Sequence, residues 1–383
     1  MHVALNLVYL VPGETGGMET YARELIPELA ARDDVEVTCL VNREAASAGD
    51  GPWGEVCPME IVPVRASSRI EWVRGEQQHV PRLAAQIGAD LVHSLASTAP
   101  LWGRVPRVTT IHDLNYLLVP EAHFGLRALG MRALVPASAR RSRRVIVDAS
   151  STRDELVEHL GLEVSKIDVA PLAAKGVGTQ PPTPEAELRT RLGLGDRRVL
   201  LSPGAKRPHK NLTSVLDALA RIPPAERPVV VATGYATPYE DDLRAHAERV
   251  GVAAELVMPS WLGAADLEGL YAIAVLVVFV SRAEGFGLPV LEAMARGVPV
   301  IASNRSSLPE VAGDAAVLAD PDDAPAIAAA ISGLLADAQL RFRMAERGRE
   351  RAATFSWART ATLTVDSYGR ALRMGASGPG GGP

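Results

Sequence analysis

Short apolar segments alternate with longer amphipathic segments along the first half of the chain. Apolar runs of this length predict buried β-strands, here at residues 3–11, 35–41, 90–93, 108–112, 145–148 and 167–170. Spacing typical of helices appears between them, at residues 18–32, 71–87 and 126–141. The sequence Thr152-Arg-Asp-Glu155 has the pattern of a capping box and predicts the start of a further helix.

A second series of the same kind follows a change in composition at residues 173–184, which are rich in glycine, proline and threonine. Strands are predicted at residues 199–202, 229–233, 256–258, 276–280, 298–302 and 316–318. Helices are predicted at residues 212–221, 239–250, 264–272, 289–296, 323–335, 339–353 and 356–374.

Strands that alternate with helices indicate βαβ units and parallel sheets covered on both faces. The sequence therefore predicts an α/β protein of two doubly wound, Rossmann-like domains that face a central cleft. We expect the N-terminal domain at residues 1–172, a linker at 173–197 and the C-terminal domain at 198–355. Residues 356–374 form a last helix, and the Gly-rich end, 375–383, is expected to be disordered.

Composition and charge narrow the class of protein. The chain has 383 residues, 47% hydrophobic and 22% charged, which is ordinary globular usage and excludes fibrous or largely disordered proteins. A net charge of −5 gives no overall attraction for nucleic acid. Two cysteines make no disulfide framework, and no apolar run reaches the length of a membrane span. Because the apolar start lacks the features of a signal peptide, a cytoplasmic protein is expected.

In open α/β sheets, ligands bind at the carboxyl ends of the strands, so the loops after strands are the candidate sites. After the first strand, Gly16 and Gly17 precede a helix; they either approach a phosphate or form a plain tight turn, and they lack the G-x-G-x-x-G pattern. At the end of the strand predicted at 108–112, His112 is either an acid or hydrogen-bond donor at the reacting centre, or a histidine satisfied by a neighbour.

A basic loop follows the predicted strand at 199–202. The chain has only four lysines, and two of them, Lys206 and Lys210, lie in the segment GAKRPHKN together with Arg207. Three cations beside a helix start are suited to a diphosphate. The alternative is a solvated basic loop.

The segment EGFGLPVLE after the strand at 276–280 is the strongest signal. Gly285 and Gly287 give the backbone conformational freedom. The backbone amides of Phe286, Gly287 and Leu288 would therefore point at a ligand. Glu284 in the loop and Glu292 one helical turn later would each accept hydrogen bonds from hydroxyls of one ligand.

Together these motifs resemble the retaining glycosyltransferases of family 4, which have the GT-B fold. The resemblance rests on EGFGLPVLE and GAKRPHKN, and it extends through GGMETYARELIPEL, TIHDLNYLLVPEAHF, VIVDASSTRDELVEHLGLEVSKIDVAPLA and PSWLGAADLEGLYAIAVLVVFVSRAEGFG. It covers residues 1–372. It implies transfer of a sugar from a nucleotide-diphosphate sugar to an acceptor, and a last helix that crosses back to the first domain.

The resemblance also implies a role for each candidate residue. The donor diphosphate would be approached by Gly16 and Gly17 and neutralised by Lys206 and Lys210. His112 would lie by the donor sugar and the departing phosphate. Glu284 and the amides of Phe286, Gly287 and Leu288 would hold the sugar, Glu292 the ribose hydroxyls, and residues 259–262 the base. The chain departs from the family pattern at Lys206, at Ala274-Val275 and at Pro171-Leu-Ala-Ala174.

No further motif carboxylate is present as a nucleophile, which favours front-face transfer, with positioning and charge stabilisation as the protein's contribution. Asp320-Pro-Asp322 has the form of an Asp-x-Asp motif, but its place before a helix favours capping. We therefore expect no cofactor, and activity that survives EDTA.

Several alternatives stay open at this point. The stretch Arg127–Arg144 has six arginines and no acid, and is either a solvated helix face, which is favoured, or a contact to anionic lipid or an acidic acceptor. Rival functions are a sugar-nucleotide epimerase, a phosphorylase and a non-catalytic binding protein. The acceptor (a saccharide, natural product or glycolipid), the donor sugar, the nucleotide (UDP, GDP or dTDP) and the oligomeric state are not predicted.

Overall fold

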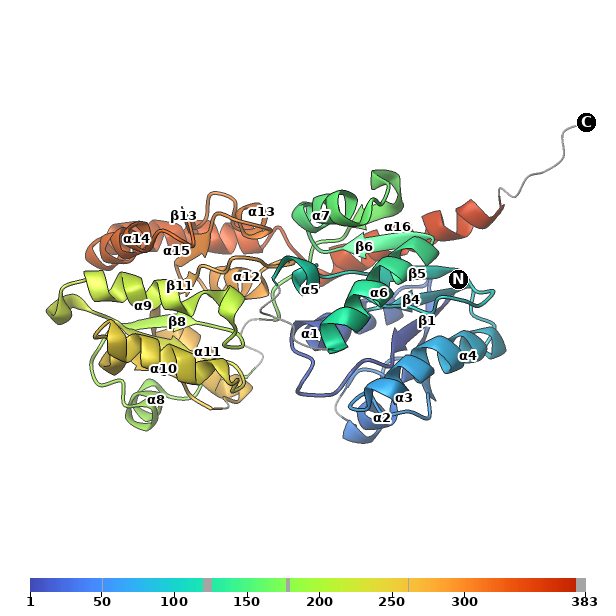
Figure 1. Cartoon of the computed structure of the whole chain (residues 1–383), viewed down its shortest axis with the longest axis horizontal. Helices are drawn as coiled ribbons and strands as arrows, with labels where there is room; N and C mark the ends of the chain where they lie inside the picture. The colour runs from blue at the N-terminus through green and yellow to red at the C-terminus, as the bar shows by residue number, and fades with distance from the viewer. Residues whose placement is uncertain (50, 120–125, 177–179, 261, 377–383) are drawn as a thin grey trace, which may run out of the picture. The chain divides into compact units, whose positions relative to one another are not determined.

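A computed structural model of the chain describes residues 1–49, 51–119, 126–176, 180–260 and 262–376 (Figure 1). The chain divides into two compact units. The first contains Met1–Leu117, Phe124–Leu172 and the C-terminal segment from Ser356, and the second contains Leu118–His123 and Ala173–Phe355.

The first unit is built on a parallel sheet of seven strands in the order β3-β2-β1-β4-β5-β6-β7. The strands are β1 (His2–Leu7), β2 (Glu36–Val41), β3 (Met59–Ile61), β4 (Leu91–Ser94), β5 (Arg107–Thr110), β6 (Arg144–Val147) and β7 (Ile167–Val169). Strand β1 is buried on both faces, since Val3, Leu5 and Leu7 on one face and Ala4 on the other are all fully buried. Helices on both faces explain this pattern.

The helices of the first unit are α1 (Gly17–Ala30), α2 (Arg43–Ala48), α3 (Arg69–Arg74), α4 (Val80–Gln86), α5 (Asn115–Leu118), α6 (Leu126–Arg141), α7 (Ser150–Leu160) and α16 (Trp357–Ala376). Although α16 ends the described chain, it packs against α1, β5, β6 and β7 of the first unit (Figure 1). Its buried Tyr368 hydroxyl lies 2.7 Å from Nδ1 of His93 on β4, so a hydrogen bond fixes the helix to the sheet.

The second unit has a parallel sheet of six strands in the order β10-β9-β8-β11-β12-β13. They are β8 (Val199–Ser202), β9 (Val229–Ala232), β10 (Leu256–Val257), β11 (Ala274–Phe279), β12 (Val300–Ser303) and β13 (Val317–Ala319). The helices are α8 (Glu185–Leu192), α9 (Leu212–Arg221), α10 (Tyr239–Arg249), α11 (Ala264–Ile273), α12 (Leu288–Ala295), α13 (Leu308–Ala312), α14 (Ala324–Ala336) and α15 (Ala338–Ala352). Together the two sheets confirm the predicted fold class of Rossmann-like, parallel α/β domains.

Several local predictions need correction. The predicted capping box is wrong, because α7 begins at Ser150 and Thr152 is buried in its first turn. The helix predicted at 71–87 is interrupted by a π-helical turn, Gly75–His79, where a Cβ on Gly75 would lie 2.7 Å from Val64. Helix α8 lies inside the predicted linker, and the sequence reading missed α2 and β3. Of the predicted tail, Gly375 and Ala376 belong to α16, and residues 377–383 lie outside the described residues.

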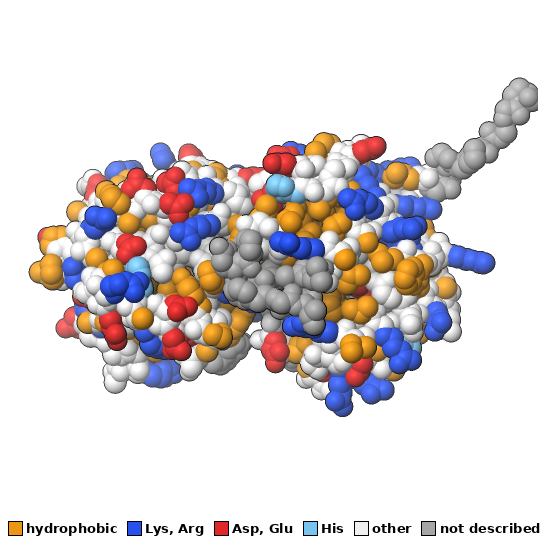
Figure 2. Space-filling view, viewed as in Figure 1, with side chains coloured by type: hydrophobic (Ala, Val, Ile, Leu, Met, Phe, Trp, Pro, Cys, Tyr) orange, Lys and Arg blue, Asp and Glu red, His pale blue; other side chains and the backbone are white. Residues whose placement is uncertain are grey.

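On the face seen in Figure 2, acidic and basic side chains are interspersed over the second unit. Among the described residues, no helix is long and apolar enough to cross a membrane.

Candidate functional site

The strand order places a topological switch point in the second unit between β8 and β11. From β8 the chain winds outward through β9 and β10, and it then returns to β11 on the other side of β8. Adjacent loops that leave the carboxyl ends of two such strands form the ligand-binding position of doubly wound sheets. The loop after β8 carries Lys210, and the loop after β11 carries Glu284.

Lys210 and Glu284 are brought into direct contact. The Lys210 ammonium donates to Oε1 of Glu284 at 2.6 Å, and it lies 4.8 Å from the centre of the Phe279 ring at the end of β11. The side chains keep 19% and 11% of their surface exposed, so a ligand can reach both groups. An ammonium and a carboxylate held together at a sheet's switch point are suited to a ligand that has phosphate and hydroxyl groups.

Asn211 fixes the position of the Lys210 loop. It is fully buried and adopts the left-handed conformation, with a φ of 58°, between the short helical turn Pro208–Lys210 and α9. Its side-chain amide donates to the carbonyl of Val280 at 3.2 Å and to that of Pro321 at 2.6 Å. The β8 loop is thereby bonded to the ends of β11 and β13.

Two serines hold the backbone of the Glu284 loop. The Ser306 hydroxyl accepts from the Glu284 amide at 3.2 Å and donates to its carbonyl at 2.6 Å. The Ser307 hydroxyl donates to the carbonyls of Glu284 at 3.0 Å and of Phe286 at 2.8 Å. The Glu284 side chain is therefore set on a backbone with little freedom.

Gly287 is required by this turn. Its φ is 102°, and a Cβ there would lie 2.4 Å from Cδ2 of Leu308. It is the N-terminal cap of α12, which starts at Leu288 with Pro289 in its first turn, as the sequence predicted. The first amides of α12 have no partner within the helix, and they give the loop a partial positive charge that suits an anion or a hydroxyl oxygen.

Glu292 lies one turn into α12 and contacts helix α11. The Tyr271 hydroxyl of α11 donates to its Oε2 at 3.3 Å. Burial raises the pKa of Glu292, and the nearby Arg296 guanidinium opposes this shift. Glu292 is thus a partly desolvated carboxylate with a hydrogen-bond partner on one oxygen.

Lys206 is placed differently from Lys210. Its side chain is fully buried, and its ammonium donates to the carbonyl of Gly234 at 2.7 Å and lies 3.0 Å from Oε1 of Glu240. In this structure the ammonium therefore joins the loop after β8 to the loop after β9 and to α10. The role predicted for Lys206, neutralising the donor diphosphate, stays a prediction, and in this structure protein groups bind its ammonium.

In the first unit, Gly16 and Gly17 form the start of α1. Gly16 caps the helix with φ 60° and ψ −131°, a conformation open to glycine, and added Cβ atoms on either residue would meet nothing within 4 Å. The Gly13 amide donates to Glu19 at 2.7 Å. This start of α1 follows β1, which flanks the switch point of its own sheet.

His112, in the loop that follows β5, is held by two acceptors. Its Nδ1 lies 2.7 Å from Oδ2 of Asp148, and its Nε2 lies 2.9 Å from the carbonyl oxygen of Leu95. A neutral imidazole can donate to one of them, and an imidazolium donates to both. Burial opposes the charge, but the Asp148 carboxylate and the Leu95 carbonyl raise the pKa of His112 overall. Burial also raises the pKa of Asp148, although the imidazolium opposes that shift.

We expect Asp148→Asn to lower the pKa of His112, because it removes the carboxylate and leaves the effect of burial. The stability that the imidazolium contributes is fully present below the pKa of an unfolded histidine, about 6.5, and is lost as pH rises through the higher folded value. NMR titration of the histidine rings measures the shift. Asp154→Asn, at an exposed carboxylate of α7, is the control, and equal His112 pKa values in wild type and Asp148→Asn would contradict the assignment.

The segment Asp320-Pro-Asp322 forms ion pairs within the second unit. Asp320 binds Arg305 at 2.7 Å, Asp322 binds Arg305 at 2.7 Å, and Asp323 is the residue that caps α14. The expected capping by Asp320 or Asp322 is therefore wrong.

Part of the basic stretch Arg127–Arg144 is bound within the first unit. Arg144 is buried and lies 2.5 Å from Asp168, and Arg143 donates to the carbonyl of Ala371 in α16 at 2.9 Å. The predicted solvated helix face is found for Arg132, Arg140 and Arg141, which are exposed, but it does not describe Arg143 and Arg144. The side chain of Arg127 lies outside the described residues.

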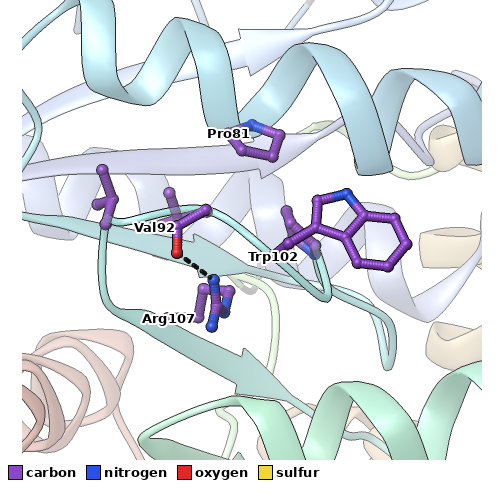
Figure 3. A pocket seen from close by; sticks show the side chains of 7 residues that line it. Pro81, Val92, Trp102 and Arg107 are labelled. Atoms are coloured by element: carbon purple, nitrogen blue, oxygen red, sulfur yellow. Dashed lines mark hydrogen bonds between the residues drawn. The ribbon is translucent and has the colours of Figure 1, made fainter.

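A shallow hollow in the first unit lies apart from these loops. Pro81, Val92, Trp102 and Arg107 line it (Figure 3), and the Trp102 side chain is 61% exposed. Because Arg107 is the first residue of β5, the hollow lies where that strand begins. The candidate residues follow the carboxyl ends of strands instead.

Comparison with known proteins decides the family. A model described as glycosyl transferases group 1 matches residues 185–351, and one described as glycosyltransferase family 4 matches residues 15–173. The O-antigen chain mannosyltransferase B of Escherichia coli is 32% identical over 265 residues, which cover 68% of this chain and 69% of the relative. The D-inositol 3-phosphate glycosyltransferase of Segniliparus rotundus is 31% identical over 401 residues, covering 96% of this chain and 87% of the relative.

The chain belongs to the group 1 glycosyltransferases of family 4. It is therefore a transferase, as the motifs predicted.

Solved structures of low sequence identity share the fold of this glycosyltransferase. A sucrose-phosphate synthase from Thermosynechococcus elongatus superposes with a TM-score of 0.77 at 21% identity, covering 98% of this chain and 100% of that one. Anabaena HepE in complex with UDP and glucose has a TM-score of 0.75 at 20% identity, covering 96% and 99%. The GT-B fold is thus confirmed.

Sequence reasoning missed several residues that position the site of the glycosyltransferase. Asn211 had a usable signal, because asparagine tolerates the left-handed conformation and stands directly before a predicted helix. Asp148 is the last residue of the strand predicted at 145–148, which was also a usable signal. Glu240, Ser306 and Ser307 gave no signal, since only the fold brings them to Lys206 and Glu284.

Proposed function

We propose that this glycosyltransferase moves a hexose-type sugar from a nucleotide-diphosphate sugar to an acceptor hydroxyl, with retention of anomeric configuration and without a metal ion. The contact between Lys210 and Glu284 carries the proposal. It puts a cation for phosphate and a carboxylate for sugar hydroxyls at the switch point of one sheet.

On this proposal, Lys210 neutralises charge that builds up on the departing diphosphate. Its ammonium has three hydrogens, and only the bond to Glu284 and the Phe279 ring engage it among the described residues. Glu284 accepts hydrogen bonds from the sugar. The backbone amides of Phe286 and Gly287, which precede α12, and of Leu288, its first residue, bind the sugar oxygens. Glu292 accepts from the ribose hydroxyls on the oxygen that Tyr271 leaves open.

Gly16, Gly17 and His112 lie in the first unit, and their predicted roles stay predictions. The open start of α1 has backbone amides that are suited to an anion such as a phosphate. His112, held between the Asp148 carboxylate and the Leu95 carbonyl, is assigned the donor sugar and the departing phosphate. Because Lys206 is buried, we assign it the support of the β8 loop through Gly234 and Glu240, and no phosphate contact.

The reaction follows a front-face course. The bond from the anomeric carbon to the diphosphate oxygen breaks, and the acceptor oxygen forms its bond to that carbon on the same face. A leaving-group phosphate oxygen takes the acceptor proton, so the products are a glycoside and a nucleoside diphosphate. The protein supplies positioning and charge stabilisation.

The relatives support a hexose donor and a polyhydroxyl acceptor. One is named as a mannosyltransferase of O-antigen chains and another as a glycosyltransferase of inositol 3-phosphate. We accordingly propose a saccharide or cyclitol acceptor ahead of a glycolipid or another natural product. UDP, GDP and dTDP are the candidate nucleotides.

The test is a transfer reaction run in EDTA, after a thermal-shift panel of UDP, GDP and dTDP has selected the nucleotide. We expect a rate unchanged by the chelator, since Lys210 and the α12 amides supply the charge that a metal would supply. We expect ¹H NMR to show the anomeric configuration of the donor in the product. An inverted product, or a rate lost in EDTA and restored by a divalent cation, would contradict the proposal.

The same assay distinguishes the alternatives. A sugar-nucleotide epimerase would convert the donor without forming a glycoside, and a non-catalytic protein would bind nucleotide without turnover on any acceptor.

A further inference from the structure

The first unit has a pair of cysteines that the transfer reaction does not use. Cys39 lies on β2 and is fully buried, and Cys57 lies in the turn before β3 and is half-buried. Their sulfur atoms are 3.3 Å apart. A disulfide bond of about 2.05 Å needs a movement of little more than 1 Å, and the backbone already joins the two segments through the bond from the Cys39 amide to the Pro58 carbonyl at 2.9 Å.

We propose that Cys39 and Cys57 form a reversible disulfide that locks the Trp53–Cys57 turn onto β2 and thereby restricts the Gly-rich start of α1. The reactive member is Cys57, because it reaches solvent and Cys39 does not. The Cys39 thiol donates to the Cys57 sulfur and so lowers the pKa of Cys57, which favours its thiolate; the same contact, with burial, raises the pKa of Cys39.

A chain of contacts joins the Cys57 turn to α1. Trp53 forms an isolated β-bridge with Cys57, and its indole donates to the Ala45 carbonyl at 3.0 Å. The Arg23 guanidinium of α1 lies 5.2 Å from the centre of the Trp53 ring.

The contacts continue from Arg23 to the Gly-rich loop. Arg23 donates to Glu19 at 2.8 Å, and the other oxygen of Glu19 accepts from the Gly13 amide at 2.7 Å. A fixed Trp53 would therefore hold the residues that lead into Gly16 and Gly17.

A peroxide or a small-molecule disulfide is the oxidant. With hydrogen peroxide, the Cys57 thiolate attacks one oxygen, the O–O bond breaks, and a sulfenic acid and one water result after proton uptake. The Cys39 sulfur then attacks the Cys57 sulfur, the S–O bond breaks, and the sulfenic oxygen leaves as a second water. Two electrons pass from the thiols to the peroxide, and a thiol reductant that attacks Cys57 reverses the step.

The experiment treats the full chain with hydrogen peroxide or oxidised glutathione and counts thiols in denaturant. We expect the count to fall from two to none, with an intact mass lower by two hydrogens, no covalent dimer on a non-reducing gel, and full recovery in dithiothreitol. Cys57→Ser is the control, and it should form no such intramolecular bond. Two surviving thiols, covalent dimers, or oxidation beyond the disulfide would overturn the proposal.

Hydrogen exchange tests the second part. In the oxidised wild type, amides of Gly13–Arg23 should exchange more slowly than in the reduced protein, and oxidant should leave them unchanged in Cys57→Ser. Unchanged exchange in a fully oxidised wild type would overturn the coupling to α1. Both readouts are independent of the proposed transfer reaction.

Discussion

Lys210→Ala is expected to lower kcat by about 10²–10³-fold, the usual loss when one preorganised donor to developing charge is removed. The ammonium is the cation that contacts Glu284, and the charge that it would meet grows on the diphosphate as the glycosidic bond breaks. KM for the donor should rise less than kcat falls, since the interaction strengthens in the transition state. Steady-state kinetics with a saturating acceptor measure both constants.

The control for this prediction is Arg221→Ala, which removes an exposed cation at the far end of α9, the helix that follows the Lys210 loop. Its kcat should stay near that of wild type. Circular dichroism and thermal melting show whether each variant folds. A folded Lys210→Ala enzyme with near-normal turnover would remove the phosphate role of Lys210.

Gly234→Ala is expected to destabilise the second unit by about 3 kcal/mol, the sum of a positive-φ penalty and an overpacking cost. The φ of Gly234 is 94°, and a Cβ there would lie 2.5 Å from the carbonyl carbon and oxygen of Gly204. The loops after β8 and β9 are also joined by the hydrogen bond from the Lys206 ammonium to the Gly234 carbonyl. Because moving the loops apart would disturb this bond, activity should fall as well. Urea unfolding, followed by circular dichroism, gives the change in midpoint.

Gly251→Ala separates the two causes. Gly251 has a φ of 74°, but a Cβ there would meet nothing within 4 Å. This variant should therefore show only the backbone penalty, about 1 kcal/mol, and full activity. Equal losses of stability in the two variants would show that the close approach of the loops after β8 and β9 is not a constraint.

Sequence patterns were sufficient for the elements that carry the site. Continuous apolar strands between amphipathic helices predicted both parallel sheets, and the predicted strand at 199–202 and helix at 212–221 coincide with β8 and α9. Glycine spacing and Pro289 predicted the start of α12 within one residue. These signals are local, so a single sequence contains them.

Contacts between distant segments were not predictable in the same way. Lys206 and Lys210 look equivalent in the segment GAKRPHKN, yet the chain folds so that Glu240 and Gly234 bury one ammonium, and Glu284 meets the other at the surface. Likewise Asp320-Pro-Asp322 gave no sign that Arg305, fifteen or more residues earlier along the chain, binds both carboxylates. Which partner a charged side chain meets therefore depends on how loops that are distant in the sequence pack together.

The central claim is that Lys210 holds the diphosphate of the donor. Calorimetric titration of wild type and Lys210→Ala, with the selected nucleoside diphosphate and with the corresponding nucleoside, tests it most directly. We predict that the substitution weakens diphosphate binding by about tenfold or more, which is about 1.4 kcal/mol, and leaves nucleoside binding unchanged. Equal diphosphate affinity in the two proteins would contradict the account.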